Sequence, residues 1–375
     1  MSRFDYASGV LELDRYPPGA ADGNLQAWDA ADEYLLAHVA TLGAITGPTL
    51  IFNDSFGALA CALRAGSPYS IGDSFLSQLA TRHNAGQNAT DDGEIRFLDS
   101  LAPLPASPGL VLMKIPKTLA LLEHQLYALR RVSGPGTQVI AAGKVRDIHN
   151  STLQRFSDIL GSTRTSLAKK KARLIFSQVT APAVNGQEQS CVWPLEENGY
   201  LIHNHANVFS RATLDIGARF FMQYLPEGLD GTLIDLGCGN GVLGLTALGQ
   251  NPRAGLHFID ESYMAIASSR INIATNRPDD MARCRFVVGN SLVGYDADSV
   301  QAVLCNPPFH QQQVLTDHIA RGMFRDAKRS LRPGGELRIV ANRHLDYYHQ
   351  IKQLFGNCAT LGSNPKFVVL RAVKT

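Results

Sequence analysis

The sequence has no apolar stretch that approaches the roughly 20 residues needed to span a bilayer. Its first residues, Met1–Asp14, carry acidic side chains and lack an apolar core, so no secretory signal peptide is expected. The six cysteines are scattered and form no C-x-x-C pair, and several lie in apolar runs where a free thiol behaves as a small hydrophobic group. These absences predict a cytoplasmic protein with reduced thiols and no membrane partner.

A metal centre is not expected either. The histidines lack the spacing with acids or cysteines that metal ligation requires. We interpret them as ordinary polar side chains; those considered are His203, His205, His310, His344 and His349.

The composition is that of an ordinary globular protein, but the charge is unevenly distributed. With 375 residues, of which 45% are hydrophobic and 18% charged, the chain is long enough for two domains. Residues 1–113 hold 5 basic and 13 acidic side chains, whereas residues 114–173 hold 12 basic and 3 acidic ones. The basic block indicates either a face that binds a polyanion or a merely solvated basic surface.

The second half alternates apolar runs with helical periodicity, which predicts a mostly parallel sheet covered by helices on both faces. The expected strands are 232–236, 255–259, 285–288, 300–305, 336–340 and 367–372. The expected helices are 241–248, 264–275 and 318–331.

The first half has the same rhythm, with strands expected at 49–53, 69–71, 95–98, 109–115 and 138–142 and helices at 25–40, 75–83 and 119–132. A polar, turn-rich segment at 178–200 is expected to be a linker or a hairpin region between the halves. We therefore predict two tandem doubly wound α/β domains, residues 1–185 and 186–375, related by an internal duplication of the fold.

Overlaying the two halves predicts that the first is degenerate. Ile51 falls on Asp235, while Asn53 and Ser55 fall on Gly237 and Gly239. By the same overlay Lys114 replaces Asn306, Lys117 replaces Phe309, and Asp99 falls on Asn290. A copy that has lost an acid and two glycines and has become basic is a plausible nucleic-acid-binding module.

A glycine-rich turn follows the first expected strand of the second half. Gly237, Gly239 and Gly241 permit positive φ and a close approach of the backbone to a ligand. The following helix begins near Val242, so its N-terminus faces that ligand. The spacing is G-x-G-x-G rather than that of a dinucleotide site, and Asp235 suits a cationic end such as the ammonium of S-adenosyl-L-methionine.

Two further polar residues follow the next strands. Asp260 ends the second strand, where a carboxylate can accept both hydroxyls of a ribose. Asn290 ends the third, where its amide can reach an adenine edge. Together with the glycine turn, they favour a nucleoside cofactor over a purely structural turn.

The tetrapeptide Asn306-Pro307-Pro308-Phe309 follows the fourth strand. The prolines fix the backbone, and the Asn306 side-chain oxygen with the Pro307 carbonyl can accept both protons of an exocyclic amine. Phe309 offers a face for stacking a base. These residues are the predicted catalytic residues of a methyl transfer to a planar amine.

The motif Asp235–Gly241, Asp260 and the tetrapeptide resemble those of class I S-adenosylmethionine-dependent amine methyltransferases. The whole chain, including 207–221 and 342–347, is similar to the bacterial ribosomal RNA guanine-N2 methyltransferases. That resemblance implies methylation of the N2 of one guanosine in 23S rRNA, on naked or protein-poor RNA. It leaves open which guanosine is modified and the oligomeric state.

Carried over to this sequence, the resemblance implies a cofactor site with Phe209 in its wall, formed by Phe209, Asp235, Gly237, Gly239, Gly241, Asp260 and Asn290. The flipped guanine would lie against Asn306, Pro307, Pro308 and Phe309. The basic residues expected to contact RNA are Lys114, Lys117, Lys169, Lys170, Lys171 and Arg173.

Three alternatives stay open from the residues. A guanosine in 16S rRNA is a second possible substrate, and a protein glutamine amide fits the same asparagine–proline tip. The basic block and the degenerate copy argue against a peptide substrate. A non-enzymatic RNA-binding factor is opposed by the intact turn at Asp235.

Overall fold

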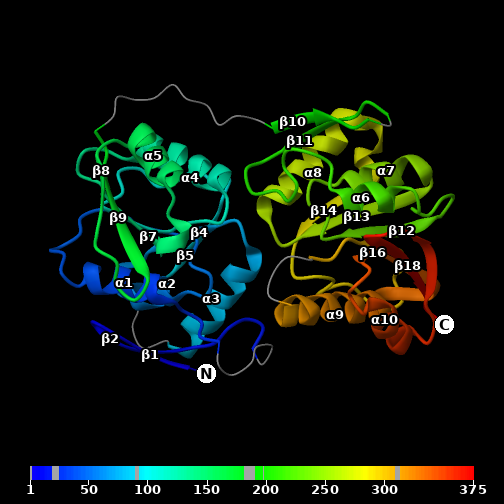
Figure 1. Ribbon diagram of the computed structural model, residues 1–375, viewed down its shortest axis with the longest axis horizontal. Coiled ribbons are helices and arrows are strands. Elements are labelled where there is room, and N and C mark those ends of the chain that lie inside the picture. The colour runs from blue at the N-terminus through cyan, green and yellow to red at the C-terminus, as the bar shows by residue number, and fades with distance from the viewer. Residues whose placement is uncertain (1, 19–24, 89–92, 181–190, 197, 309–312) are drawn as a thin grey trace. The chain divides into compact units, whose positions relative to one another are not determined.

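The computed structural model describes residues 2–18, 25–88, 93–180, 191–196, 198–308 and 313–375, the last without the side chains of 313–317. The contacts divide the chain into two compact units, Met1–Gln189 and Ser190–Thr375 (Figure 1). Within the described residues, no helix is long and apolar enough to cross a membrane.

The second unit is built on a seven-stranded sheet. Its strand order is β14-β13-β12-β15-β16-β18-β17. The strands are β12 (Gly231–Leu236), β13 (Ala254–Asp260), β14 (Cys284–Val288), β15 (Val300–Cys305), β16 (Leu331–Asn342), β17 (Ala359–Ser363) and β18 (Phe367–Val373). The first five run parallel, and β18 is antiparallel to both of its neighbours. The order reverses between β12 and β15, which is where a doubly wound sheet binds its ligand.

Helices cover both faces of this sheet because alternate residues of each strand point to opposite faces. On one face α6 (Ile216–Met222), α7 (Val242–Gln250) and α8 (Tyr263–Asn276) pack on a core that includes Leu233 and Phe258. On the other, α9 (Gln313–Ser330) and α10 (Tyr347–Phe355) pack on a core that includes Ile234 (Figure 1). The short helix η3 (Pro278–Arg283) precedes β14.

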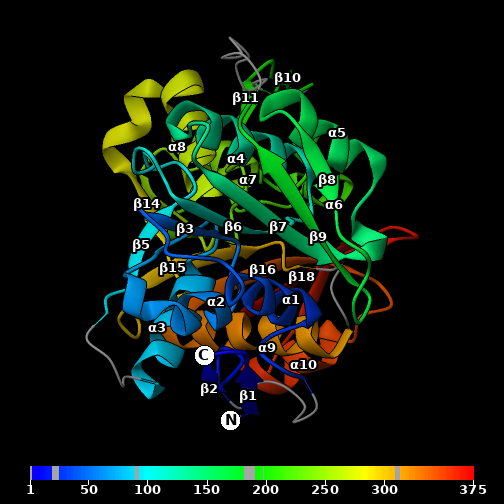
Figure 2. The ribbon, with the colours of Figure 1, turned by 90° about the vertical axis from the view of Figure 1, so that its left-hand side faces the viewer.

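The first unit repeats this architecture. Its strand order, β5-β4-β3-β6-β7-β9-β8, is the same topology element by element (Figure 2). The strands are β3 (Thr49–Phe52), β4 (Tyr69–Gly72), β5 (Arg96–Asp99), β6 (Leu110–Lys114), β7 (Gln138–Lys144), β8 (Thr163–Thr165) and β9 (Ala172–Gln178). The helices are α1 (Ala30–Val39), α2 (Ala58–Ala62), α3 (Phe75–Gln87), α4 (Leu119–Val132) and α5 (Asn150–Ile159), with the short turns η1 (Arg64–Gly66) and η2 (Val145–Asp147). The predicted duplication of the fold is confirmed.

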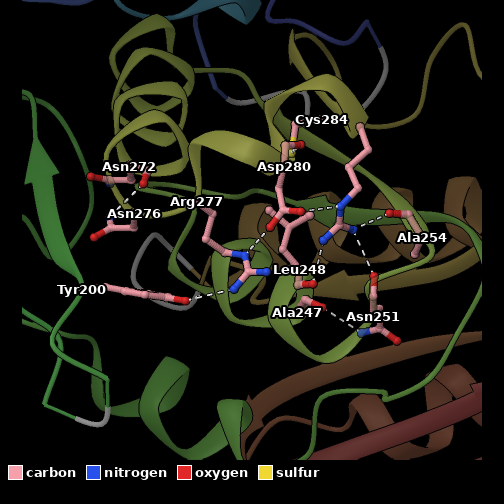
Figure 3. Close-up of polar contacts among 11 residues, drawn as sticks. Tyr200, Ala247, Leu248, Asn251, Ala254, Asn272, Asn276, Arg277, Asp280 and Cys284 are labelled. Atoms are coloured by element: carbon pink, nitrogen blue, oxygen red, sulfur yellow. Dashed lines mark hydrogen bonds and ion pairs between the residues drawn. The ribbon is translucent and has the colours of Figure 1, made fainter.

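Each unit also carries a small antiparallel hairpin before its first sheet helix. In the second unit the hairpin consists of β10 (Cys191–Pro194) and β11 (Leu201–Asn204). Asn276 exchanges two hydrogen bonds with the backbone of Leu201, at 2.8 and 2.9 Å, and Asn272 exchanges two with His203, at 2.7 and 3.0 Å. These two α8 asparagines, labelled in Figure 3, fasten β11 to the sheet domain; we call the pair the asparagine brace.

The first unit has the same brace on its hairpin of β1 (Ser2–Tyr6) and β2 (Gly9–Leu13). Asn88 exchanges hydrogen bonds of 2.8 and 2.7 Å with the backbone of Glu12, and Asn84 exchanges two of 2.9 Å with Asp14. Duplication therefore extends beyond the sheet to the hairpin and to the side chains that hold it.

Charged and polar side chains also connect the hairpin of the second unit to the region around α8 and η3. Arg277 donates to the Tyr200 hydroxyl and pairs with Asp280, as Figure 3 shows. Arg283 donates to the carbonyl of Leu248 in the last turn of α7 and to those of Asn251 and Ala254, which follow that helix. A cation is favourable there because the last carbonyls of a helix lack intrahelical donors.

One detail of the predicted overlay was wrong. Asp99 pairs with Gly72, and Val288 pairs with Asp260. Since Gly72 and Asp260 occupy the same position of the duplicated strand, Asp99 corresponds to Val288 and not to Asn290. Strand pairing determines this register, and spacing along the chain does not reveal it.

Candidate active site

The glycine turn joins β12 to α7 with three left-handed residues. Gly237, Gly239 and Gly241 have φ values of 71°, 55° and 78°. A Cβ on Gly241 would lie 2.8 Å from the Ser269 Oγ, so this glycine is required for helix packing. A Cβ on Gly239 would meet no atom within 4 Å, so its backbone faces open space. Gly239 thus has open space beside its Cα, while its N–H donates to Asp260 and its carbonyl accepts from Ser269.

Asp235 lies in β12 with no solvent exposure. Its Oδ2 accepts from the Gly244 N–H of α7 at 2.8 Å, and no partner in the described part of the chain reaches its Oδ1. Burial raises the pKa of this carboxyl to about 8, the Gly244 N–H opposes the rise, and the charge of Asp260 adds to it. A buried carboxyl with an oxygen that no described residue contacts suits a cationic ligand group, because a nearby positive charge favours the ionised form.

Asp260 ties the glycine turn to the next two strand ends. Its Oδ2 accepts from the Gly239 N–H and its Oδ1 from the Ser262 N–H, each at 2.9 Å. Its carbonyl accepts from the Gly289 N–H at 2.9 Å, which brings Asn290 to the same edge. Gly239, Asp260 and Asn290 therefore lie on one continuous surface at the carboxyl ends of the strands.

The Asn-Pro-Pro tip follows β15 at the same edge. The Asn306 Nδ2 donates to the Oδ2 of Asp215 at 3.3 Å, and the Asn306 Oδ1 is buried with no hydrogen-bond partner among the described residues. Pro307 is buried and Pro308 is exposed. Phe309 lies outside the described residues. Asn306 thus offers one acceptor that the protein itself does not use.

The segment before α6 borders this site. Phe209, predicted to form the wall of the cofactor site, is 56% exposed. Asp215 is the N-cap of α6 and was not singled out from the sequence, because the contact that reveals its role spans 91 residues. Its position before an apolar helical run is the one local signal that points to it.

In the first unit, the donors at the turn that corresponds to the glycine turn are satisfied by a side chain of the same unit. Asp54 is buried and accepts from the N–H groups of Gly57, Leu59 and Ala60, each at 2.9 Å, at the start of α2. Ala60 is the counterpart of Gly244. The N–H of Gly244 donates to an aspartate in the strand, whereas the N–H of Ala60 donates to an aspartate in the loop after the strand. The start of α2 therefore has its donors satisfied by its own chain.

The polar side chains at the ends of β3 and β6 are also hydrogen-bonded within the first unit. Asn53 and Gln125 exchange hydrogen bonds of 2.9 and 2.8 Å between their side-chain amides. The Lys114 Nζ donates to Asp29 at 2.9 Å and to Asp32 at 2.7 Å. Although burial opposes it, the charges of Asp32 and Asp29 raise the pKa of Lys114. The expectation that Lys114 contacts RNA does not fit this geometry, since its ammonium is buried and paired with carboxylates.

The remaining predicted RNA contacts lie on the surface of the first unit. Lys117, Lys169, Lys170 and Lys171 are exposed and Arg173 is half-buried. Lys170 and Lys171 form the two-residue turn between Lys169 and Ala172, which exchange two backbone hydrogen bonds of 2.8 Å. Both turn residues have positive φ, 48° and 65°. This conformation normally favours asparagine and glycine.

Similarity to known proteins covers the whole chain. Residues 1–181 match the family model described as the RLMG N-terminal domain, and residues 199–371 match that of the methyltransferase small domain. Ribosomal RNA large subunit methyltransferase G of Erwinia tasmaniensis is 61% identical over 374 residues, covering 100% of both chains. The chain belongs to the ribosomal RNA large subunit methyltransferase G family.

A Klebsiella pneumoniae member of the large subunit methyltransferase G family is 59% identical, covering 100% of this chain and 99% of its own. Among solved structures, the T. thermophilus 16S rRNA N2 G1207 methyltransferase in complex with AdoMet and guanosine has a TM-score of 0.78. It is 18% identical and covers 100% of this chain and 98% of its own; at that identity the likeness shows the fold. The predictions of a methyltransferase and of two tandem doubly wound domains are confirmed.

Proposed function

We propose that the chain methylates the exocyclic N2 of a guanosine in 23S rRNA, with S-adenosyl-L-methionine as methyl donor. The observation that carries this proposal is the buried Asn306 Oδ1, which has no hydrogen-bond partner among the described residues. Pro307 follows it in the chain, and its carbonyl would be the second acceptor. Two acceptors match an amine that carries two protons. Membership of the large subunit methyltransferase G family favours the large subunit RNA over 16S rRNA and over a protein glutamine.

The residues at the strand ends fit the cofactor. Asp235 would face the ammonium group, because its Oδ1 is buried and unpartnered. The open backbone at Gly239 gives a ligand close access, and Asp260 lies beside it with a carboxylate suited to ribose hydroxyls. Asn290 would reach the adenine edge, with Phe209 in the wall of the site. When bound, S-adenosyl-L-methionine supplies an electrophilic methyl group.

The chain's own contribution to the reaction is orientation. The Asn306 Oδ1 and the Pro307 carbonyl accept the two N2 protons, which turns the nitrogen lone pair toward the incoming methyl group. The guanine N2 is a weak nucleophile because its lone pair is delocalised, so acceptors on its protons increase its electron density. Most of the rate acceleration then comes from positioning rather than from acid–base chemistry.

The first unit is proposed to bind RNA, in a cytoplasmic protein whose substrate is naked or protein-poor 23S rRNA. Its candidate RNA contacts are the exposed Lys117, Lys169, Lys170 and Lys171 and the half-buried Arg173. Each cation that neutralises a phosphate releases condensed counterions, so binding depends steeply on salt. The six cysteines are free, as a reducing compartment requires.

The test is Asn306→Ala. We expect this variant to bind S-adenosylmethionine and naked 23S rRNA with wild-type affinity and to lose at least about 100-fold in methylation rate, since the reacting nitrogen is no longer oriented. Methylation is measured by transfer of a labelled methyl group, and the product is located by mass mapping of the RNA. A variant that methylates N2 at the wild-type rate would refute the assignment.

A further inference from the structure

Asp215 makes the contact that decides how the Asn306 amide is oriented. An asparagine side chain carries a donor and an acceptor on two nearly isosteric positions, so either can face a ligand after a flip. A carboxylate only accepts hydrogen bonds. Because the Asp215 Oδ2 lies 3.3 Å from the Asn306 side chain, the NH₂ group must face Asp215 and the Oδ1 must face away from it.

Asp215 is itself held firmly. As the N-cap of α6, its Oδ2 also accepts from the Ala218 N–H at 2.8 Å. Gly217 leaves the room that this requires: a Cβ there would lie 3.0 Å from the Asp215 Oδ2 and 3.3 Å from the Phe367 ring. The carboxylate oxygen that contacts Asn306 is therefore held by the Ala218 N–H at the start of a helix, and Gly217 of that helix lies close to the Phe367 ring of β18.

We propose that Asp215 is a positioning residue for methyl transfer, which sets the Asn306 amide as a hydrogen-bond acceptor toward the substrate. In that orientation the tip accepts from an NH₂ group; in the flipped orientation it would present a donor to the amine and repel it. Asp215 thus contributes to the choice of an exocyclic amine as substrate. This inference rests on the proposed function of Asn306.

The decisive variant is Asp215→Ser. Serine is as good an N-cap as aspartate, so the Ala218 N–H keeps its acceptor, but the shorter side chain does not reach Asn306. We expect the affinities for S-adenosylmethionine and RNA to stay within about twofold, while the single-turnover methylation rate falls about tenfold because the amide is no longer held in one orientation.

Asp215→Asn is the conservative partner of this variant. Its Oδ1 can take the place of the Oδ2, since the Ala218 N–H demands an acceptor there, and it then still accepts from Asn306. We expect it to restore most of the rate lost in Asp215→Ser. An equal loss in both variants, with both folded by thermal unfolding, would overturn the proposal.

A double-variant cycle separates positioning from general damage. If Asp215 acts through Asn306, Asp215→Ser should not slow the residual methylation of Asn306→Ala any further. The same tenfold loss in both backgrounds would overturn the proposal. Full activity of Asn306→Ala would instead refute the proposed function, so the two failures are distinguishable.

Discussion

Asp235 is a carboxyl group that the folded chain keeps out of water. Its pKa is raised to about 8 by burial, whereas an unfolded aspartate titrates near 3.8. The folded state therefore retains a proton that the unfolded state has lost between these two values. Because the folded state binds more protons there, stability decreases as pH rises from about 4 to about 8.

Asp235→Asn should remove this pH dependence, since an amide oxygen still accepts from the Gly244 N–H but carries no titrating proton. We expect the wild type to lose stability relative to the variant on going from pH 5 to pH 8. The loss is about 1.4 kcal/mol for each pH unit over which the folded state keeps a proton that the unfolded state has released. Urea unfolding of both proteins at the two pH values measures this. Parallel pH dependence in both proteins would contradict it.

Lys114 is the residue whose role the structure changes most. Lys114→Met should destabilise the first unit by about 3 kcal/mol, because it leaves the buried Asp32 without its cation, whereas the half-exposed Asp29 stays in contact with water. The expected RNA affinity of the folded variant is that of the wild type. Denaturant unfolding and filter binding measure the two effects, and a folded, stable variant with weakened RNA binding would restore the original expectation.

Lys117 supplies the matched control, because it is exposed and lies close to Lys114 in the sequence. Lys117→Met should leave stability unchanged within about 0.5 kcal/mol. Its RNA binding should weaken, with a salt dependence reduced by about one charge.

At the scale of single elements, the turn between β8 and β9 combines strain with charge. Lysine at positive φ costs about 1 kcal/mol or more per residue relative to glycine. The double variant Lys170→Asn with Lys171→Gly has the pair that such a turn prefers. We expect it to raise the free energy of unfolding by about 1–2 kcal/mol and to lower RNA affinity.

The control for lost charge is Lys352→Ala on α10 of the second unit, which is exposed and was not predicted to contact RNA. It should change RNA affinity less than the turn variant does. A turn variant that is more stable and binds RNA as well as the wild type would show that the lysines have no part in binding.

The regular strands and most helices were readable from the sequence, because hydrophobic periodicity reports burial directly. The prediction missed α5, α10 and β9, whose polar residues or charged neighbours mask their buried faces. The short elements α2, α6, β8 and β17 were missed as well. It also missed the hairpin β1–β2 and both asparagine braces. A brace joins residues about 70 apart, such as Asn84 and Asp14, and no local pattern encodes such a pair.

The candidate site was predicted in outline for the same reason. Gly239 and Asp260 each follow an apolar strand, and parallel strands end at one edge. Asp215 was out of reach because its contact with Asn306 depends on packing. The ion pairs of Lys114 with Asp29 and Asp32 could not be predicted either, since spacing places a residue at a strand end but does not identify its partners.

For the whole molecule, two tandem units should bind one cofactor. The first unit has Ile51 in place of Asp235, and Asp54 satisfies the donors of α2. Isothermal titration with S-adenosylmethionine should give one site per chain. Asp260→Ala, which alters the second unit alone, should abolish binding; a second site, or binding that survives this change, would contradict the assignment.

The asparagine brace also determines where the chain can be divided. A fragment that begins at Leu201 would retain β11 but not its partner β10, and the brace would then hold an unpaired strand. A fragment intended to carry the second unit alone should therefore begin before Cys191. By the same reasoning, an affinity tag on the first unit is better fused through a spacer, because Phe4 of β1 is part of that unit's core.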